Sequence, residues 1–206
     1  MFDPASGERA LLGLLALTER ESRFAEVCEW LQIAADNAES DERRISWLKR
    51  LATAQRDGLQ SPSDAITTLE SILQIDESDA EARASLATAY EAEKRFDDLI
   101  TFLGRLADAE SYPGRVVALQ LEVARIEDLA GRPEGALATV ERVLELVSAG
   151  AEADAALALL ERFHTRDDVP QGRVRAALEK QYRVREDGPR LIGVLRERME
   201  HEPSER

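Results

Sequence analysis

Residues 80–110, AEARASLATAYEAEKRFDDLITFLGRLADAE, decide the fold class of this 206-residue chain. In a first segment Leu86, Ala87 and Tyr90 lie at helical spacing on one face, and a Lys94-Arg95 turn separates this segment from a second one with the same periodicity. The apolar positions of the second segment are Phe96, Leu99, Ile100, Leu103 and Leu106. Two helices this short cannot bury their apolar faces alone, so the stretch predicts similar helix pairs on both sides of it.

The same pattern recurs along the chain. Matching positions of the first and second helices lie 12 residues apart in three pairs: Ala87 and Leu99, Ala124 and Ala136, and Leu15 and Val27. In a fourth pair, Ala52 and Ala65, the separation is 13 residues. Pairs in phase predict an all-α solenoid of antiparallel helix hairpins, with about 11 helices in a single array over residues 1–206. The expected hairpins cover about residues 8–38, 42–75, 79–109, 114–148 and 151–186, and a closing helix covers about 189–202.

The best unit resembles the tetratricopeptide repeat (TPR), whose unit is about 34 residues long. The matching residues are Leu86, Ala87, Tyr90, Phe96, Leu99, Leu103 and Leu106, with Ile75-Asp76 where the family often has Leu-Asp-Pro. Arg83 stands where the family often has Trp, and Leu99 and Leu106 replace its usual Ala. The resemblance covers roughly residues 8–202 and implies a right-handed superhelix with a concave groove, the usual docking surface of the family. Phe2-Asp3-Pro4 is similar to the signature between units, so we expect a segment of a longer, bacterial-type TPR array.

Two registers fit the sequence after residue 150. Strict alternation makes residues 151–164 a first helix and about 170–186 its partner, whereas matching of motifs pairs Leu178 and Tyr182 with the final helix and leaves 151–164 as an extra helix. We favour alternation, because a contiguous solenoid cannot skip a layer without exposing an apolar face. The final helix then acts as a cap. Its expected inward residues are Leu191, Ile192, Leu195 and Met199, and its expected solvent-facing residues are Arg190, Glu197 and Glu200.

Charge and composition exclude several classes of function. The net charge of −14 argues against nucleic acid as a partner, because affinity for a phosphate backbone comes from clustered Lys and Arg. No run approaches the roughly 18 apolar residues that a membrane-spanning helix requires, so no membrane insertion is expected. Cys28 is the only cysteine, which rules out an intrachain disulfide. A cytoplasmic location is the default expectation, and an export signal on a longer natural chain would escape this reading.

The sequence predicts no catalytic, cofactor or metal site. His164 and His201 are the only histidines, and neither has a second His or a Cys at ligand spacing. Cys28 lies between Val27 and Leu31 on an apolar helix face, where it fits the role of a small hydrophobic residue. The glycines are scattered and form no phosphate-binding loop. We therefore expect that the protein is not an enzyme.

The remaining candidate is a binding surface on the first helices of the hairpins. Its basic and acidic residues balance, so it would be less acidic than the rest of the chain. The candidate partner-binding residues are Arg9, Lys49, Arg56, Glu91 and Arg125. The four cations could bind acidic side chains or the C-terminal carboxylate of a partner.

Two functions from different classes follow from these observations. The favoured one is a non-catalytic scaffold that binds a partner peptide or helix in the groove. The alternative is a regulatory or sensor module of a larger protein, which binds a peptide or small ligand and signals to a further domain. If the closing helix is not a true cap, the ends of two arrays can also stack and form a homodimer.

Overall fold

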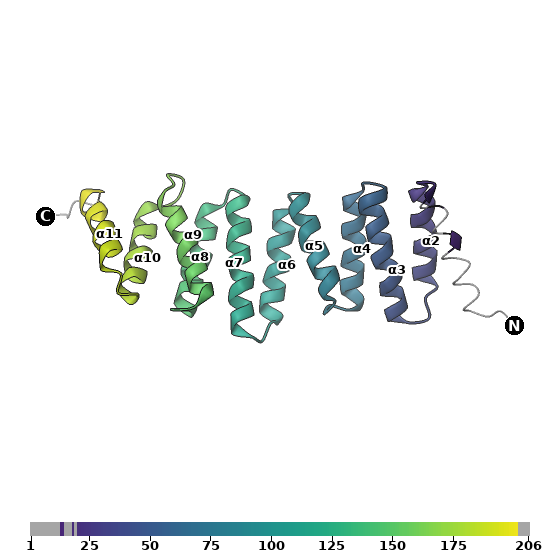
Figure 1. The fold of residues 1–206 in the computed structure, drawn as a ribbon, viewed down its shortest axis with the longest axis horizontal. Coiled ribbons are helices and arrows are strands. Elements are labelled where there is room, and N and C mark those ends of the chain that lie inside the picture. Colours follow the sequence, from purple (N-terminus) through teal and green to yellow (C-terminus); the bar gives the residue numbers. More distant parts are fainter. Residues whose placement is uncertain (1–12, 15–17, 19, 202–206) are drawn as a thin grey trace. The chain divides into compact units, whose positions relative to one another are not determined.

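The computed structural model describes residues 13, 14, 18 and 20–201, which contain ten α-helices, one π-helical turn and no strand (Figure 1). The fold of these residues is all-α, as the sequence predicts. The first expected helix, about 8–20, lies mostly outside the described residues. The chain divides into two compact units, Met1–Arg95 and Phe96–Arg206. That residues 1–206 form one array stays a prediction.

The described residues of the first unit include four α-helices, each of which packs on the next: α2 (Phe24–Asp36), α3 (Asp41–Thr53), α4 (Pro62–Ile75) and α5 (Ala80–Ala92). Ser40 and Asp79 cap α3 and α5, because their side chains accept hydrogen bonds from backbone N–H groups of the first turn. Pro62 opens α4, and the Ser61 hydroxyl before it donates to Asp64 and makes no capping hydrogen bond to the backbone. The core consists of the fully buried residues Val27, Leu31, Leu51, Ile66, Ile72 and Leu86.

A π-helical turn, η1 (Ala54–Gly58), continues α3 at its carboxyl end. It lies between Ala52 and Ala65, the one pair whose repeat step is 13 residues instead of 12. A π turn holds one more residue than an α turn without ending the helix, so it accommodates this extra residue. Such turns are frequent at functional sites, and η1 brings Arg56 and Asp57 to the surface described below.

Residues 96–201 of the second unit form six α-helices that also pack in order: α6 (Phe96–Ala109), α7 (Pro113–Leu129), α8 (Pro133–Leu146), α9 (Ala151–His164), α10 (Gln171–Val184) and α11 (Gly188–His201). Helix α9 contacts both α8 and α7, and α10 contacts both α9 and α8. The alternating register that we favoured after residue 150 stays a prediction. The largest fully buried side chains of this unit are Leu99, Ile126, Leu137, Leu160, Phe163 and Leu178.

The motif that suggested the other register has a local structural basis. Tyr90 and Tyr182 each accept a backbone hydrogen bond from the residue five positions later, at 2.8 Å from Arg95 and 2.9 Å from Asp187. In both turns the preceding residue has a φ of 56°. Gly131 ends α7 in the same left-handed conformation, which favours glycine. The tight turn after α10 thus has the same backbone form as the turn after α5, which explains why the motif of Leu178 and Tyr182 resembles that of a first helix.

The expected inward face of α11 is partly wrong. Val194 is its most buried side chain, and Leu191 packs against the core of the second unit. Ile192 is 52% exposed and Met199 is 78% exposed, so neither points inward. The error arises because α11 carries apolar residues on two opposite faces, and periodicity alone cannot select the buried one.

Ion pairs tie helices of the second unit about one repeat apart. The Asp128 carboxylate, only 8% exposed, accepts hydrogen bonds from Arg162 and Arg166. Similar pairs join Arg173 to Glu141, Arg185 to Asp154 and Arg190 to Glu161. Most of these charges are exposed and contribute little each, but Asp128 is buried and depends on its partners.

No helix in the described range has the length and apolar character that crossing a membrane demands.

Candidate functional site

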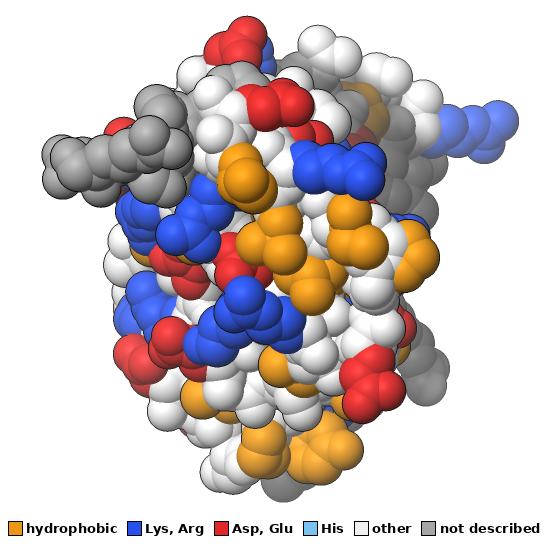
Figure 2. Space-filling view, turned by 90° about the vertical axis from the view of Figure 1, so that its left-hand side faces the viewer, with side chains coloured by type: hydrophobic (Ala, Val, Ile, Leu, Met, Phe, Trp, Pro, Cys, Tyr) orange, Lys and Arg blue, Asp and Glu red, His pale blue; other side chains and the backbone are white. Residues whose placement is uncertain are grey.

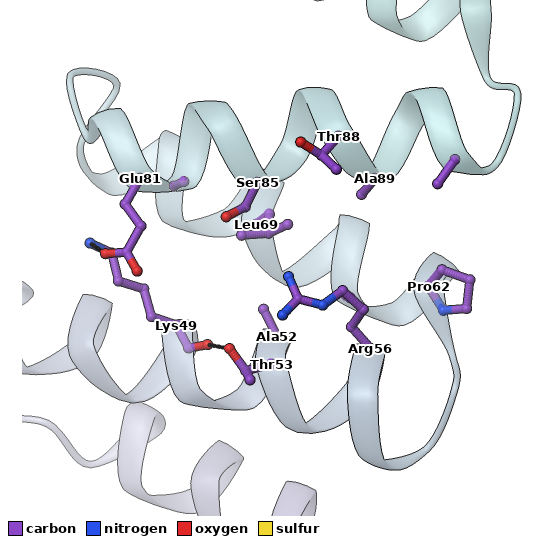
Figure 3. A pocket seen from close by; sticks show the side chains of 13 residues that line it. Lys49, Ala52, Thr53, Arg56, Pro62, Leu69, Glu81, Ser85, Thr88 and Ala89 are labelled. Atoms are coloured by element: carbon purple, nitrogen blue, oxygen red, sulfur yellow. Dashed lines mark hydrogen bonds and ion pairs between the residues drawn. The ribbon is translucent and has the colours of Figure 1, made fainter.

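A pocket of about 120 Å³ opens between α3, η1 and α5 in the first unit (Figure 3). Its floor consists of small or aliphatic side chains that are almost fully buried: Ala52, Ala65, Leu69, Ala82 and Ala89. Its rim carries the charged or hydroxyl-bearing side chains Lys49, Thr53, Arg56, Glu81, Ser85 and Thr88. An apolar floor with a few polar groups around it is the usual composition of a ligand-binding pocket.

A wider hollow of about 500 Å³ adjoins this pocket and shares Lys49, Thr53 and Glu81 with it. Phe24, Asp57 and Gly58 line its other side. We call the pocket and the hollow together the α3–α5 groove. It lies on the first helices of the second and third expected hairpins, which is the surface that the sequence analysis selected for partner binding.

Lys49 ties the two walls of the groove together. Its Nζ lies 2.8 Å from Asp79 Oδ2 and 2.8 Å from Glu81 Oε2. The hydrogen bond to Asp79, followed by the one to Glu81, raises the pKa of Lys49. Burial acts to raise the pKa of Asp79, but the hydrogen bonds from Lys49 and the Ala82 N–H outweigh it and leave that pKa below its usual value. Both groups are therefore charged over the physiological pH range, and Lys49 serves mainly as a bridge from α3 to α5.

Arg56 is placed differently from Lys49. Figure 3 shows its side chain reaching from η1 across the pocket towards α5. Its Nε and Nη2 donate to the two carboxylate oxygens of Asp57 at 2.7 and 2.9 Å. This bidentate pair raises the pKa of Arg56 and lowers that of Asp57, but both side chains are at least half exposed. An exposed pair of sequence neighbours is worth little, so an incoming carboxylate can compete with Asp57 for the guanidinium.

Two hydroxyl groups on the rim already donate hydrogen bonds within their own helices. Thr53 and Thr88 donate to the carbonyl oxygens of Lys49 and Ala84, four residues earlier in their own helices. The half-buried Ser85 hydroxyl makes no hydrogen bond to any described residue. Ser85 therefore offers a donor and an acceptor beside the apolar floor.

Gly58, at the end of η1, lies directly against the ring of Phe24. A Cβ atom at this position would lie 2.2 Å from Cδ1 of the Phe24 ring, a distance that real atoms do not tolerate. The ring of Phe24 thus packs directly on the glycine backbone. The absence of a side chain at Gly58 allows α2 and η1 to approach closely.

The structure brings only part of the expected site together. Lys49 and Arg56 line one pocket, and Glu91 lies on α5 but outside the pocket lining. Arg125 lies in the second unit, where its Nη2 is 2.6 Å from Glu122 Oε1. Arg9 is outside the described residues. Whether these five residues bind a partner stays a prediction.

Sequence reasoning missed Asp79 and the apolar floor of the pocket. The capping role of Asp79 could have been predicted, because an Asp directly before a helical run is a typical N-cap. Its contact with Lys49, 30 residues earlier, depends on how the two helices pack and leaves no pattern in the sequence.

The histidine and the cysteine considered as chemical sites, His164 and Cys28, each lie in an ordinary structural contact. His164 Nε2 lies 2.8 Å from Glu197 Oε2, and this contact joins α9 to α11. Cys28 is half-buried, and burial, with a smaller effect of Asp64, raises the pKa of its thiol. Within the described residues no three His, Cys, Asp or Glu side chains are grouped to hold a metal ion.

The fold and the groove together define a class of protein: an all-α chain of helices packed in sequence order, with a small apolar pocket between α3, η1 and α5. Searches of solved structures find similarity to two crystal structures of MamA. One shares 15% identity over 84% of this chain and 95% of that chain, and the other 13% over 96% of both, each with a TM-score of 0.44. A tetratricopeptide repeat protein from Parabacteroides merdae ATCC 43184 shares 11% identity over 95% of this chain and 80% of its own, with a TM-score of 0.47. No protein-family model and no curated protein matches the chain.

Proposed function

We propose that the protein is a non-catalytic interaction module and that the α3–α5 groove binds a segment of a partner protein. The observation that carries this proposal is the pocket of about 120 Å³, which joins a buried apolar floor to a cation that faces it, Arg56. This volume suits a single aliphatic side chain. A partner segment would insert such a side chain and place an acidic group next to the guanidinium.

The two cations of the groove have separate roles in this proposal. Lys49 remains bonded to Asp79, whose side chain is only 13% exposed, because breaking that pair would leave a mostly buried carboxylate without a counter-charge. Arg56 can exchange its weak, exposed partner Asp57 for an acidic group of the ligand. Ser85 can add one hydrogen bond to the backbone or a side chain of the bound segment.

The test begins with affinity capture from a lysate of the source cells and identification of the bound protein by mass spectrometry. The binding segment is then titrated calorimetrically against the wild type and three variants. Arg56→Glu reverses the charge in the pocket, and Ser85→Leu fills the pocket from its wall. Arg44→Glu makes the same charge change on an exposed position of α3 outside the pocket lining.

The expected result is a loss of affinity of about tenfold or more for Arg56→Glu and Ser85→Leu, with Arg44→Glu close to wild type. Equal affinities for all four proteins would show that the partner binds elsewhere. A loss for Arg56→Glu and Arg44→Glu alike would mean that general charge attraction, not the groove, holds the partner.

A further inference from the structure

The outward face of α11 is apolar and carries a single central cation. Ile192, Arg196 and Met199 follow at intervals of four and three residues, on the side of the helix opposite the buried Val194. The view onto the C-terminal end, the α11 side of Figure 1, shows hydrophobic side chains gathered into a patch that Lys and Arg side chains adjoin (Figure 2). A helix with apolar residues on both faces is typical of one that is covered on both sides.

Arg196 is the exception among the arginines of α11. Arg190 pairs with Glu161 and Arg198 pairs with Glu179, so both fix α11 to the second unit. Arg196 is exposed and makes no hydrogen bond or ion pair with any described residue. An unpaired cation between two exposed apolar side chains fits a surface that presents apolar groups around a carboxylate.

Helix α2 presents a surface of that kind. Among the described helices, α2 and α11 are the two that each carry a pair of exposed large hydrophobic side chains, and in α2 these are Trp30 and Ile33. Glu29 precedes Ile33 by one helical turn, is exposed, and has no bonding partner in the described part of the chain. Helix α2 contains no Lys or Arg, so the charged residues of its outward face are all acidic, whereas the outward face of α11 carries the cation Arg196 with Glu200 one turn later.

We propose that the outward face of α11 binds the outward face of α2 on a second copy of the chain, with Arg196 of one copy paired to Glu29 of the other. Apolar contact between Ile192 and Met199 on one side and Ile33 on the other supplies the burial, and the charges set the orientation. The two faces are different, so the contact is heterologous. After each addition the assembly as a whole still has one free α2 face and one free α11 face, so it is open-ended unless it closes into a ring.

The proposal is independent of the groove, because it uses neither α3 nor α5. It also explains why α11 departs from the expected cap. A true cap has a polar outer face, whereas the outer face of α11 has Ile192 and Met199 exposed by 52% and 78%.

The first test measures the weight-average mass of the full chain by sedimentation equilibrium over a series of protein concentrations. The wild type should associate reversibly, and its mass should rise past that of a dimer. Arg196→Glu and Glu29→Arg should each weaken association about tenfold. The double variant with both changes should regain it, because the opposite charges face each other again with their positions exchanged.

A second test separates this geometry from a two-fold dimer. Ile33→Asp disables the α2 face in one sample, and Ile192→Asp disables the α11 face in another. Each variant alone should stay monomeric, and an equimolar mixture should form heterodimers and nothing larger. Circular dichroism checks that the variants fold, which is expected because all four substituted positions are exposed.

Three results would overturn the proposal. A wild type that stays monomeric at every concentration would show that the faces do not bind each other. Failure of the double charge exchange to restore association would show that Arg196 and Glu29 do not meet. Association of Ile192→Asp with itself as strong as in the wild type would place the contact elsewhere.

Discussion

Replacement of Lys49 by Met removes the cation that bridges α3 to α5 while it preserves the length of the side chain. Two carboxylates lose their partner. Glu81 is 73% exposed and contributes little, whereas Asp79 is 13% exposed and is left mostly buried without a counter-charge. Loss of one partner of a fully buried ion pair costs about 3–5 kcal/mol. Because Asp79 keeps its hydrogen bond from the Ala82 N–H and some contact with water, we expect about 2 kcal/mol for Lys49→Met.

The assay is urea unfolding followed by circular dichroism, with Arg44→Met as a matched control. Arg44 is exposed on the same helix and has no partner in the described part of the chain, so its loss should change the free energy of unfolding by less than about 0.5 kcal/mol. Asp79→Asn completes a double-mutant cycle, because Asn remains a good N-cap for α5. The coupling free energy of Lys49 and Asp79 should be about 1–2 kcal/mol. A cost for Lys49→Met no larger than that of the control, or a coupling near zero, would refute the bridge.

The same pair sets the direction of a pH dependence. The pKa of Asp79 is lowered in the folded protein, so its contribution is present above the usual pKa of 3.8 and is lost as the pH falls through the lowered value. The pKa of Lys49 is raised, so its contribution is complete below the usual 10.5 and is lost as the pH rises through the raised value. Stability measured against pH should therefore decrease less steeply at both extremes in the Lys49→Met, Asp79→Asn double variant than in the wild type. Identical profiles would contradict this assignment.

Three further predictions concern single positions. Gly58→Ala should cost about 1–3 kcal/mol in urea unfolding, because its Cβ would overlap the Phe24 ring, whereas Gly104→Ala in α6, with nothing within 4 Å, should be neutral or stabilising. Asp128→Asn should cost about 2–3 kcal/mol, because it removes the buried charge that pairs with Arg162 and Arg166, while Asp97→Asn, at an exposed pair with Arg132, should leave the urea midpoint close to that of the wild type. The Cys28 thiol, whose pKa is raised by burial, should react with Ellman's reagent more slowly in the native chain than in urea, and equal rates would contradict its half-buried position.

The helices were the most predictable part of this protein. Pro62, Pro113 and Pro133 each open a helix, as their fixed φ and missing N–H favour, and Gly131 ends one with a positive φ. These local signals do not depend on the rest of the fold, so the sequence alone locates them. The π turn was less predictable. The single extra residue between Ala52 and Ala65 indicates that the helix is irregular there, but it does not show that the irregularity is a π turn.

Contacts between distant residues were much harder to predict. Lys49 and Arg56 were assigned to one surface because both lie on the same face of a first helix, and the structure places them on one pocket. Their different roles depend on Asp79, which reaches Lys49 only through the packing of α3 and α5. The buried face of the closing helix could not be predicted either, since Val194 and Met199 are both apolar and only packing decides which of them is buried.

The central claim, that the α3–α5 groove is the docking surface, is tested most directly by hydrogen–deuterium exchange with the captured partner. If the claim holds, partner binding should slow amide exchange in residues 49–57 and 81–92, and exchange in α8 and α10 should not change. Protection confined to α8, α10 or α11, with the groove exchanging at its free rate, would contradict the claim and place the partner in the second unit.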